Sequence, residues 1–291
     1  MKVRRDGLLV LDKPPGLTST QALGQAKRQL QILKGGHTGT LDPLATGVLV
    51  LCFGEATKVA PFLLEADKRY QVTIGLGVST TTYDAQGEIT QQLPVQVDRT
   101  QVARWLPEFL GDIEQVPPRF SAIRKDGMRF YERARKGGME TPPPRRVRID
   151  RIDIVALEGT DLTLDVACGK GVYVRSLAHD LGARLGCGGH VKALQRLAVA
   201  GFTIDQAVAL AEVNERTPLV PSDEALRHLP AVDLPPLLAA AVCKGRAVHM
   251  EALAPGLARL YDADRRFLGV GTIAADGSIR PKRLWSAGGS G

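Results

Sequence analysis

Apolar and polar residues alternate along two stretches of the chain, residues 70–76 and 162–166. Because successive side chains of a strand point to opposite faces, a period of two is typical of a half-buried strand. Continuous apolar runs predict a short strand at residues 8–11 and a buried strand at residues 47–53. Another strand is expected from Val147, since the prolines just before it cannot continue a helix.

Apolar residues at helical spacing predict helices between these strands. One helix is expected to begin at an N-cap of Ser19 or Thr20 and to end before Gly35. Another is predicted after a tight glycine turn by a leucine stripe at i, i+4 spacing, Leu177, Leu181 and Leu185. Further helices are expected at residues 57–64, 100–110, 128–136 and 201–214.

A segment rich in proline and polar residues, 217–236, predicts a junction between two domains. We place the domains at residues 1–227 and 228–291. The second contains three short apolar stretches separated by turn sequences, which predict strands at residues 257–260, 267–273 and 279–284. The C-terminal domain is therefore expected to be small and rich in strands, with the last six residues as a disordered tail.

The composition is that of an ordinary globular protein, with 44% hydrophobic and 24% charged residues. No apolar run approaches the ~20 residues that span a bilayer, and the N-terminus lacks the pattern of a signal peptide. The four cysteines form no CxxC pair, which favours a reducing, cytoplasmic setting. Cys187 and His190 supply only half of a zinc site, so we expect no metal.

Positive charge is concentrated in one part of the chain. The formal net charge is +7, and residues 119–151 hold eleven basic against four acidic residues, which accounts for all of it. Phe120, Phe130 and Tyr131 lie within the same segment. Basic side chains pair with phosphates and aromatic rings stack on bases, so this segment favours contact with a nucleic acid. The alternative is a solvated helix face.

A single acidic residue stands between a glycine-rich turn and the strand predicted at residues 47–53. It is Asp42, in the sequence GGHTGTLDPLATGVLV of residues 35–50. Pro43 biases Asp42 away from helical geometry, and the glycines permit close approach of a ligand. An aspartate is ionised near neutral pH and attacks an electrophilic carbon without a separate base. Aspartate beside glycine and proline also forms Asx turns, so the loop alone leaves both interpretations open.

Arg175 falls near the first turn of a predicted helix, where the helix dipole disfavours a cation. An anionic partner would compensate, whereas a surface arginine bonded to a local carbonyl is the alternative. His37 shares the glycine-rich loop with Asp42, but the loop between them gives weak geometry for an acid–base pair. The phosphate-binding patterns GxxxxGK[ST] and GxGxxG are absent, which argues against a nucleotide cofactor.

The sequence GGHTGTLDPLATGVL resembles the catalytic signature of the TruB family, the bacterial tRNA pseudouridine-55 synthases. The resemblance begins at LLVLDKPPG, before this signature, and continues after it in order through GEATK, DKRY, DIEQVPPRFSA, GKGVYVR, LGCGGHV and RRFLG. It implies an α+β fold with a mixed, mostly antiparallel sheet flanked by helices, and a small PUA-like C-terminal domain. Residues 119–146 would then be an RNA-binding insertion in a catalytic domain.

The resemblance also implies roles for three candidate catalytic residues. Asp42 takes the position of the family's nucleophilic aspartate. Arg175, in a GxYxR motif, takes that of the arginine that pairs with it and keeps it ionised. Tyr70 matches a tyrosine that stacks on the target base and is discussed as a proton carrier, although an ordinary core tyrosine is the alternative.

Four more residues match positions near the family's substrate. Tyr173 and Leu194 correspond to residues that line the uridine pocket, although Leu194 by itself would be interpreted as core. His37 corresponds to a histidine that stacks into the RNA beside the flipped nucleotide. Lys13 falls in a motif near the site, and a structural lysine is its alternative.

The implied activity is isomerisation of uridine 55 in the T loop of tRNA to pseudouridine, after base flipping. Because the product is an isomer, we expect no cofactor. The expected partner is the T stem-loop of tRNA, bound by a monomer without an obligatory protein partner. Two alternatives are a noncatalytic RNA-binding factor and a synthase directed by a guide RNA. The presence of Asp42, Tyr70 and Arg175 argues against the first, and the basic insertion with a short C-terminal domain argues against the second.

Overall fold

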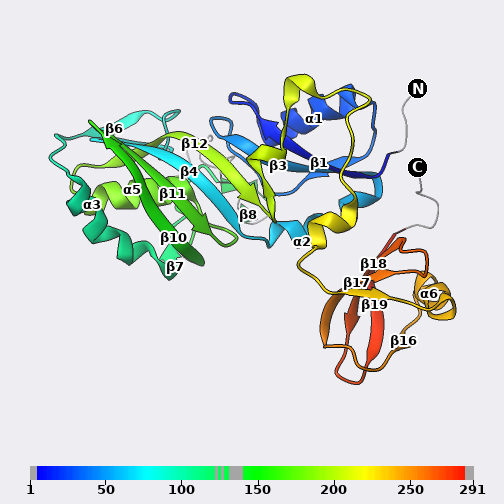
Figure 1. The fold of residues 1–291 in the computed structure, drawn as a ribbon. Helices are drawn as coiled ribbons and strands as arrows, with labels where there is room; N and C mark the ends of the chain where they lie inside the picture. Colours follow the sequence, from blue (N-terminus) through cyan, green and yellow to red (C-terminus); the bar gives the residue numbers. More distant parts are fainter. Residues whose placement is uncertain (1–4, 122–123, 126–127, 131–139, 286–291) are drawn as a thin grey trace.

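The computed structural model of the chain describes residues 5–121, 124–125, 128–130 and 140–285. Within these residues, a ten-stranded sheet forms the centre of the larger part of the molecule (Figure 1). Its main path runs in the order β14 (Val208–Ala209), β1 (Gly7–Lys13), β3 (Thr46–Phe53), β12 (Gly189–Val199), β4 (Lys68–Leu76), β11 (Asp161–Cys168), β10 (Arg145–Glu158) and β7 (Gly111–Gln115). The remaining two strands are β2 (Gly35–His37), which pairs with β3, and β13 (Phe202–Thr203), which pairs with β12.

Most neighbouring strands of this sheet run antiparallel. Among the described residues of this sheet, the parallel pairs are β1 with β14 and β3 with β12. Two small hairpins accompany the sheet, one of β5 (Val78–Thr80) with β6 (Ile89–Gln92) and one of β8 (Arg124–Lys125) with β9 (Met128–Arg129). The mixed, mostly antiparallel sheet confirms the predicted α+β fold class.

The helices in the described part of the chain are α1 (Ser19–Gln29), α2 (Ala60–Leu64), α3 (Arg99–Trp105), α5 (Val174–Arg184) and α6 (Pro236–Cys243). The predicted N-cap of α1 is wrong, since Thr18 caps it. Its side chain accepts from Gln21 N at 3.1 Å, and the Gln21 side chain accepts from Thr18 N. Ser19 is instead buried and bonds to the backbone of Leu41. The leucine stripe predicted on α5 is confirmed, with Leu177 and Leu181 fully buried.

Strand β1 is a continuous apolar run because both faces of the sheet are covered there. Leu9 belongs to a core that also contains Ala22 of α1. Its neighbour Leu8 belongs to a second core, with Phe202 and Leu226 from later in the chain. Burial on both faces removes the polar alternation that a half-exposed strand keeps.

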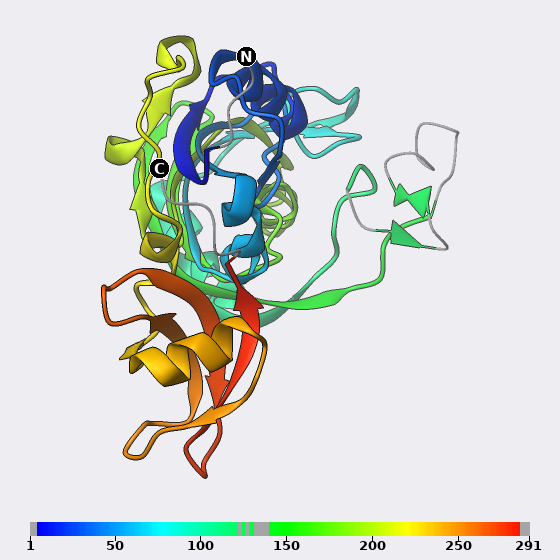
Figure 2. The same cartoon turned by 90° about the vertical axis from the view of Figure 1, so that its right-hand side faces the viewer.

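A smaller five-stranded sheet follows in the C-terminal part of the chain (Figure 2). Its order is β15 (Ala231–Asp233), β17 (Gly256–Tyr261), β18 (Phe267–Ile273), β19 (Ser278–Leu284) and β16 (Val248–His249). The three strands predicted here are confirmed, and α6 packs beside β16 and β19. The sheet meets the larger part of the molecule near α2, where Lys58 Nζ donates to Leu284 O at 2.7 Å.

One helix prediction is wrong, and a second is only partly covered by the described residues. Residues 201–214 form β13, β14 and short 3-10 turns, because this segment pairs with β12 on one side and β1 on the other. Of the helix predicted at residues 128–136, Met128–Arg129 is instead a strand that pairs with Arg124–Lys125, Phe130 is helical, and residues 131–136 lie outside the described residues. The C-terminal residues predicted to be a disordered tail, 286–291, also lie outside them.

Gly47 is required where β3 passes β12, and its substitution gives a direct test of this packing. Its φ is +95°, and a Cβ atom there would lie 2.3 Å from Arg196 O. We expect Gly47→Ala to lower the free energy of unfolding by about 2–4 kcal/mol in urea titrations. Gly36→Ala is the control, because a Cβ at Gly36 meets nothing within 4 Å. Equal midpoints for the two variants would contradict this account of Gly47.

Candidate active site

Asp42 lies on a loop that the N-terminal residues hold from both sides. Leu41 N donates to Ser19 Oγ at 2.8 Å, and Ser19 Oγ donates to Leu41 O at 3.1 Å. On the other side of Asp42, Pro43 O accepts from Gly16 N at 2.8 Å and faces Lys13 Nζ at 3.4 Å. The loop that carries the carboxylate is therefore fixed by the strand and turn that precede α1.

Arg175 forms an ion pair with Asp42. Its Nε lies 2.9 Å from Asp42 Oδ2, and its Nη2 donates to Asp42 Oδ1 at 3.3 Å. The Arg175 side chain is only 6% exposed, whereas that of Asp42 is 35% exposed. The guanidinium thus contacts both carboxylate oxygens from the buried side and leaves the carboxylate open on another side.

Asp84 is a second acidic neighbour of Arg175 that the sequence analysis missed. Its Oδ2 lies 3.5 Å from Arg175 Nη1, and its side chain is 4% exposed. Its Oδ1 accepts from Thr82 Oγ1 at 2.5 Å and from Gln86 N at 3.0 Å. Asp84 and Asp42 are the anionic compensation that the position of Arg175 in the first turn of α5 predicts. The signal missed in the sequence is an aspartate in the turn after β5, far from either motif.

Two carbonyl groups complete the surroundings of Arg175. Nη1 donates to Thr82 O at 3.2 Å, and Nη2 donates to Phe120 O at 3.0 Å. Every nitrogen of the guanidinium therefore has an oxygen neighbour. Nη1 and Nη2 donate hydrogen bonds, whereas Nε lies close to Asp42 Oδ2 without hydrogen-bond geometry. A planar group that is fixed at two of its nitrogens has one orientation, which in turn orients the Asp42 carboxylate.

The pKa of Asp42 reflects opposing effects. Burial raises the pKa above its ordinary value, and the Arg175 guanidinium opposes this rise. The charge of Asp84 raises the pKa further, and that of Lys13 lowers it. Loss of Arg175 would leave burial and Asp84 without their main opposing charge.

Tyr70 comes from the middle of the sheet and lies beside a buried arginine. It is 8% exposed and pairs in register with Arg196 of β12. The Arg196 side chain lies close enough to oppose the rise that burial causes in the pKa of Tyr70, and its Nε donates to Val48 O at 2.7 Å. Burial raises the pKa of Tyr70, and the charge of Asp42 adds to this rise, which indicates that Asp42 is near.

Tyr173 directly precedes α5 and is held by Gln115. Tyr173 N donates to Gln115 Oε1 at 2.7 Å, and Gln115 Nε2 donates to Tyr173 O at 3.0 Å. Burial raises the pKa of Tyr173, and the charges of Arg175 and Asp42 also act on it. Gln115 is 2% exposed and was missed by the sequence analysis, because nothing local distinguishes it from a surface glutamine.

Lys13 is fully buried and close to the Asp42 loop. Besides facing Pro43 O, its Nζ donates to Pro14 O at 2.8 Å and Leu17 O at 2.7 Å. Burial lowers the pKa of Lys13 to about 8, with the charge of Asp42 opposing the change. These contacts agree with both interpretations of Lys13, since the residue holds the loop and lies near the carboxylate.

His37 and Leu194 lie around Arg196. Leu194 is 7% exposed and shares a face of β12 with Arg196, two residues along the strand. His37 pairs with Leu51 in the β2–β3 hairpin, and burial lowers its pKa with a smaller effect from Arg196. The structure thus brings Lys13, Tyr70, Tyr173 and Arg175 into electrostatic range of Asp42. His37 and Leu194 lie beside Arg196 instead, and neither is placed in contact with the Asp42 carboxylate.

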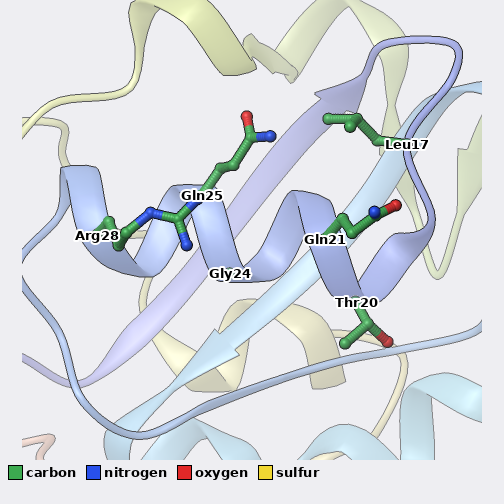
Figure 3. Close-up of a pocket in the computed structure, with 6 residues that line it drawn as sticks. All are labelled: Leu17, Thr20, Gln21, Gly24, Gln25 and Arg28. Atoms are coloured by element: carbon green, nitrogen blue, oxygen red, sulfur yellow. The ribbon is translucent and has the colours of Figure 1, made fainter.

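Figure 3 shows a separate hollow along the outer face of α1. None of the predicted site residues lines it, and its lining residues are Leu17, Thr20, Gln21, Gly24, Gln25 and Arg28. Across the described residues, no group of three or more His, Cys, Asp or Glu side chains could hold a metal ion. None of the helices in that part of the chain is both long enough and apolar enough to cross a membrane.

Models of one protein family match almost the whole chain. Residues 27–174 match the TruB family pseudouridylate synthase N-terminal domain. Residues 175–230 match the tRNA pseudouridylate synthase B C-terminal domain, and residues 230–285 match the pseudouridine synthase II TruB C-terminal model.

Curated relatives and solved structures agree with these matches. A tRNA pseudouridine synthase B of Stutzerimonas stutzeri is 46% identical, covering 97% of each chain. One of Dechloromonas aromatica is also 46% identical and covers 96% of this chain and 95% of its own. A chain from the crystal structure of a Cbf5-Nop10-Gar1 complex is 25% identical, with a TM-score of 0.74 over 96% of this chain and 84% of that chain. From its family matches, its relatives and its fold, the chain belongs to the TruB family of pseudouridine synthases.

Proposed function

We propose that the protein converts uridine 55 in the T loop of tRNA to pseudouridine, with Asp42 as the nucleophile. The observation that carries the proposal is the ion pair between Arg175 and Asp42, in which Arg175 Nε lies 2.9 Å from Asp42 Oδ2. The Asp42 side chain is still 35% exposed in this pair, so a substrate can approach it. The relatives named tRNA pseudouridine synthase B support tRNA as the substrate. We further propose that the protein acts as a monomer in the cytoplasm.

Binding of tRNA would use charge and shape. Within the basic segment of residues 119–146, the described strands β8 and β9 stand away from the main sheet (Figure 2). A segment that carries excess positive charge suits the phosphates of an RNA stem. The domain of residues 1–227 would catalyse the reaction. The PUA-like domain of residues 228–291 would contact a part of the RNA outside the catalytic domain.

The target uridine must leave the RNA stack before Asp42 reaches it. Flipping costs a few kcal/mol of lost stacking energy. Contacts between the pocket and the extruded base have to compensate for this loss. Tyr70, Tyr173 and Leu194 offer two rings and one apolar side chain for those contacts, with His37 holding the vacated space in the RNA. Base stacking on an aromatic ring contributes about 1–3 kcal/mol.

In the chemical step, Asp42 attacks uracil C6 or ribose C1′. The bond between N1 and C1′ breaks, the base turns, and C5 forms a bond to C1′. The bond between Asp42 and the substrate also breaks, which regenerates the carboxylate. The proton on C5 is lost and N1 gains one, so the product is an isomer of the substrate. Arg175 orients the carboxylate for attack and favours its ionised form.

Tyr70 would act first as a stacking ring and then as a proton relay. Because burial raises its pKa, its hydroxyl is protonated before the reaction. A protonated phenol accepts the C5 proton only while it passes its own proton on. The nearby Arg196 guanidinium, whose charge opposes the rise in the pKa of Tyr70, would stabilise the phenol oxygen during this exchange.

Replacement of the nucleophile gives the first test. Asp42→Asn should abolish pseudouridine formation, because an amide is not a nucleophile of comparable strength. Its affinity for tRNA should stay within about tenfold, a difference of about 1.4 kcal/mol. Turnover is measured on a tRNA transcript, and binding by filter retention. Activity comparable to that of the unchanged protein would refute the role of Asp42.

The pH profile tests the role of Arg175. Asp42 works as a carboxylate, so activity falls as the pH drops through its pKa. Arg175→Gln removes the charge that opposes burial, so the pKa of Asp42 should rise and the acidic limb of kcat/KM should move to higher pH. Arg184→Gln is the control, since Arg184 lies on the same helix in an exposed ion pair with Glu108. If the acidic limb of kcat/KM in Arg175→Gln lies at the same pH as in the unchanged protein, Arg175 does not keep Asp42 ionised.

An isolated T-arm hairpin with a tritium label on uridine C5 tests the reaction and its target. We expect release of the label to water without any added guide RNA, and pseudouridine at the position equivalent to 55. A noncatalytic RNA-binding factor would retain the label while binding the hairpin. A guide-directed synthase would release it only when a guide is added.

A further inference from the structure

Tyr83 and His179 form a stacked pair of rings next to the active site. Their ring centroids are 3.9 Å apart, and the ring planes differ by 9°. Tyr83 lies in the turn between β5 and β6, and His179 lies on α5, one helical turn after Arg175. Because residues four apart lie on one face of a helix, the stack is on the same side of α5 as Arg175.

The backbone of Tyr83 adopts a conformation that a tyrosine disfavours. Its φ is +63°, in the left-handed region where a bulky side chain is a genuine outlier. Such a conformation persists only where the surroundings impose it, and it is often found at functional sites. The residues on either side, Thr82 and Asp84, both contact Arg175.

The hydrogen bonds of this turn fix it to the sheet. Val191 N of β12 donates to Tyr83 O at 3.0 Å, and Ala85 N donates to Val191 O at 2.9 Å. Within the turn, Tyr83 N donates to Thr80 O at 3.3 Å. These bonds orient the turn against β12, but none of them joins it to α5.

The bonds of the Asp84 carboxylate are likewise internal to the turn. Thr82 Oγ1 and Gln86 N both bond Asp84 Oδ1, and both belong to the segment that carries Asp84. These two bonds fix the Asp84 carboxylate within the turn. They do not fix the distance between the turn and Arg175, which depends on other contacts. The stack of Tyr83 on His179 is a further contact between the turn and α5, beside the two that Thr82 O and Asp84 Oδ2 make with Arg175.

We propose that Tyr83 and His179 are positioning residues, whose stacked rings hold the turn of residues 82–84 against α5 and thereby fix Arg175 on Asp42. The proposal rests on the proposed function, since it assigns a purpose to the orientation of the Asp42 carboxylate. His179 suits this role as a neutral ring, because burial lowers its pKa. The chain of contact runs from the stack through Thr82 O and Asp84 Oδ2 to the guanidinium.

Substitutions at Tyr83 separate the ring from the backbone. Tyr83→Gly removes the ring and also relieves the left-handed strain, which offsets part of the stability lost with the stack, so the protein should remain folded. We expect its single-turnover rate on a T-arm hairpin to fall about tenfold with KM unchanged, because orientation is lost and binding is not. Tyr83→Phe keeps the ring and should retain the full rate.

A double-mutant cycle tests the route of the effect. His179→Ala should lower the rate as Tyr83→Gly does, and the two together should cost no more than either alone. In an Asp84→Asn background, Tyr83→Gly should have a clearly smaller effect than in the unchanged protein. His179→Phe restores a stacking surface and should recover most of the rate.

Several outcomes would overturn the proposal. A Tyr83→Gly variant that turns over at the full rate would refute it while leaving Asp42 as the nucleophile. A raised KM with an unchanged rate would show that the ring contacts RNA instead. Additive losses in the double mutant would show that the two rings act separately. If the unchanged protein forms no pseudouridine at all, the proposed function fails, and the positioning role with it.

Discussion

The ion pair between Arg175 and Asp42 is the interaction on which the site depends. The guanidinium is almost completely buried, and a buried charge is costly unless it is paired and hydrogen-bonded. Here two carboxylates and two backbone carbonyls surround it. Removing one carboxylate would leave a charge that its neighbours cannot fully compensate, so the group is stable only as a set.

The central sheet brings this set together from distant parts of the sequence. β12 lies between β3 and β4, so Arg196 contacts the carbonyl of Val48 on one side and the Tyr70 side chain on the other. On the far side, Gln115 at the end of β7 bonds both backbone groups of Tyr173 and so fixes the start of α5. The Asp42 loop is held in turn by the N-terminal strand, which explains why a buried lysine lies beside it. Rigid elements therefore position every candidate catalytic residue.

Local sequence patterns predicted the elements whose burial follows their own residues. The leucine stripe of α5 and the alternation of β4 are preserved in the structure because one face of each is covered. Patterns failed where pairing partners decide the outcome. The segment of residues 201–214 becomes short strands because β1 and β12 offer it free edges, which no local periodicity records. The N-cap moved by one residue because Ser19 is used to hold Leu41.

The sequence by itself determined one candidate carboxylate, its glycine-rich loop and the family resemblance, and it left an anionic partner as one of two interpretations of Arg175. These features are local, since they follow from residue types and spacing within a few positions. Only the tertiary structure decided that Asp84, Gln115, Arg196 and the Tyr83–His179 stack belong to the site. Each of them acts through a residue dozens of positions away, and contacts at that separation arise from strand order and helix packing. Physical proximity of that kind is a property of the folded chain.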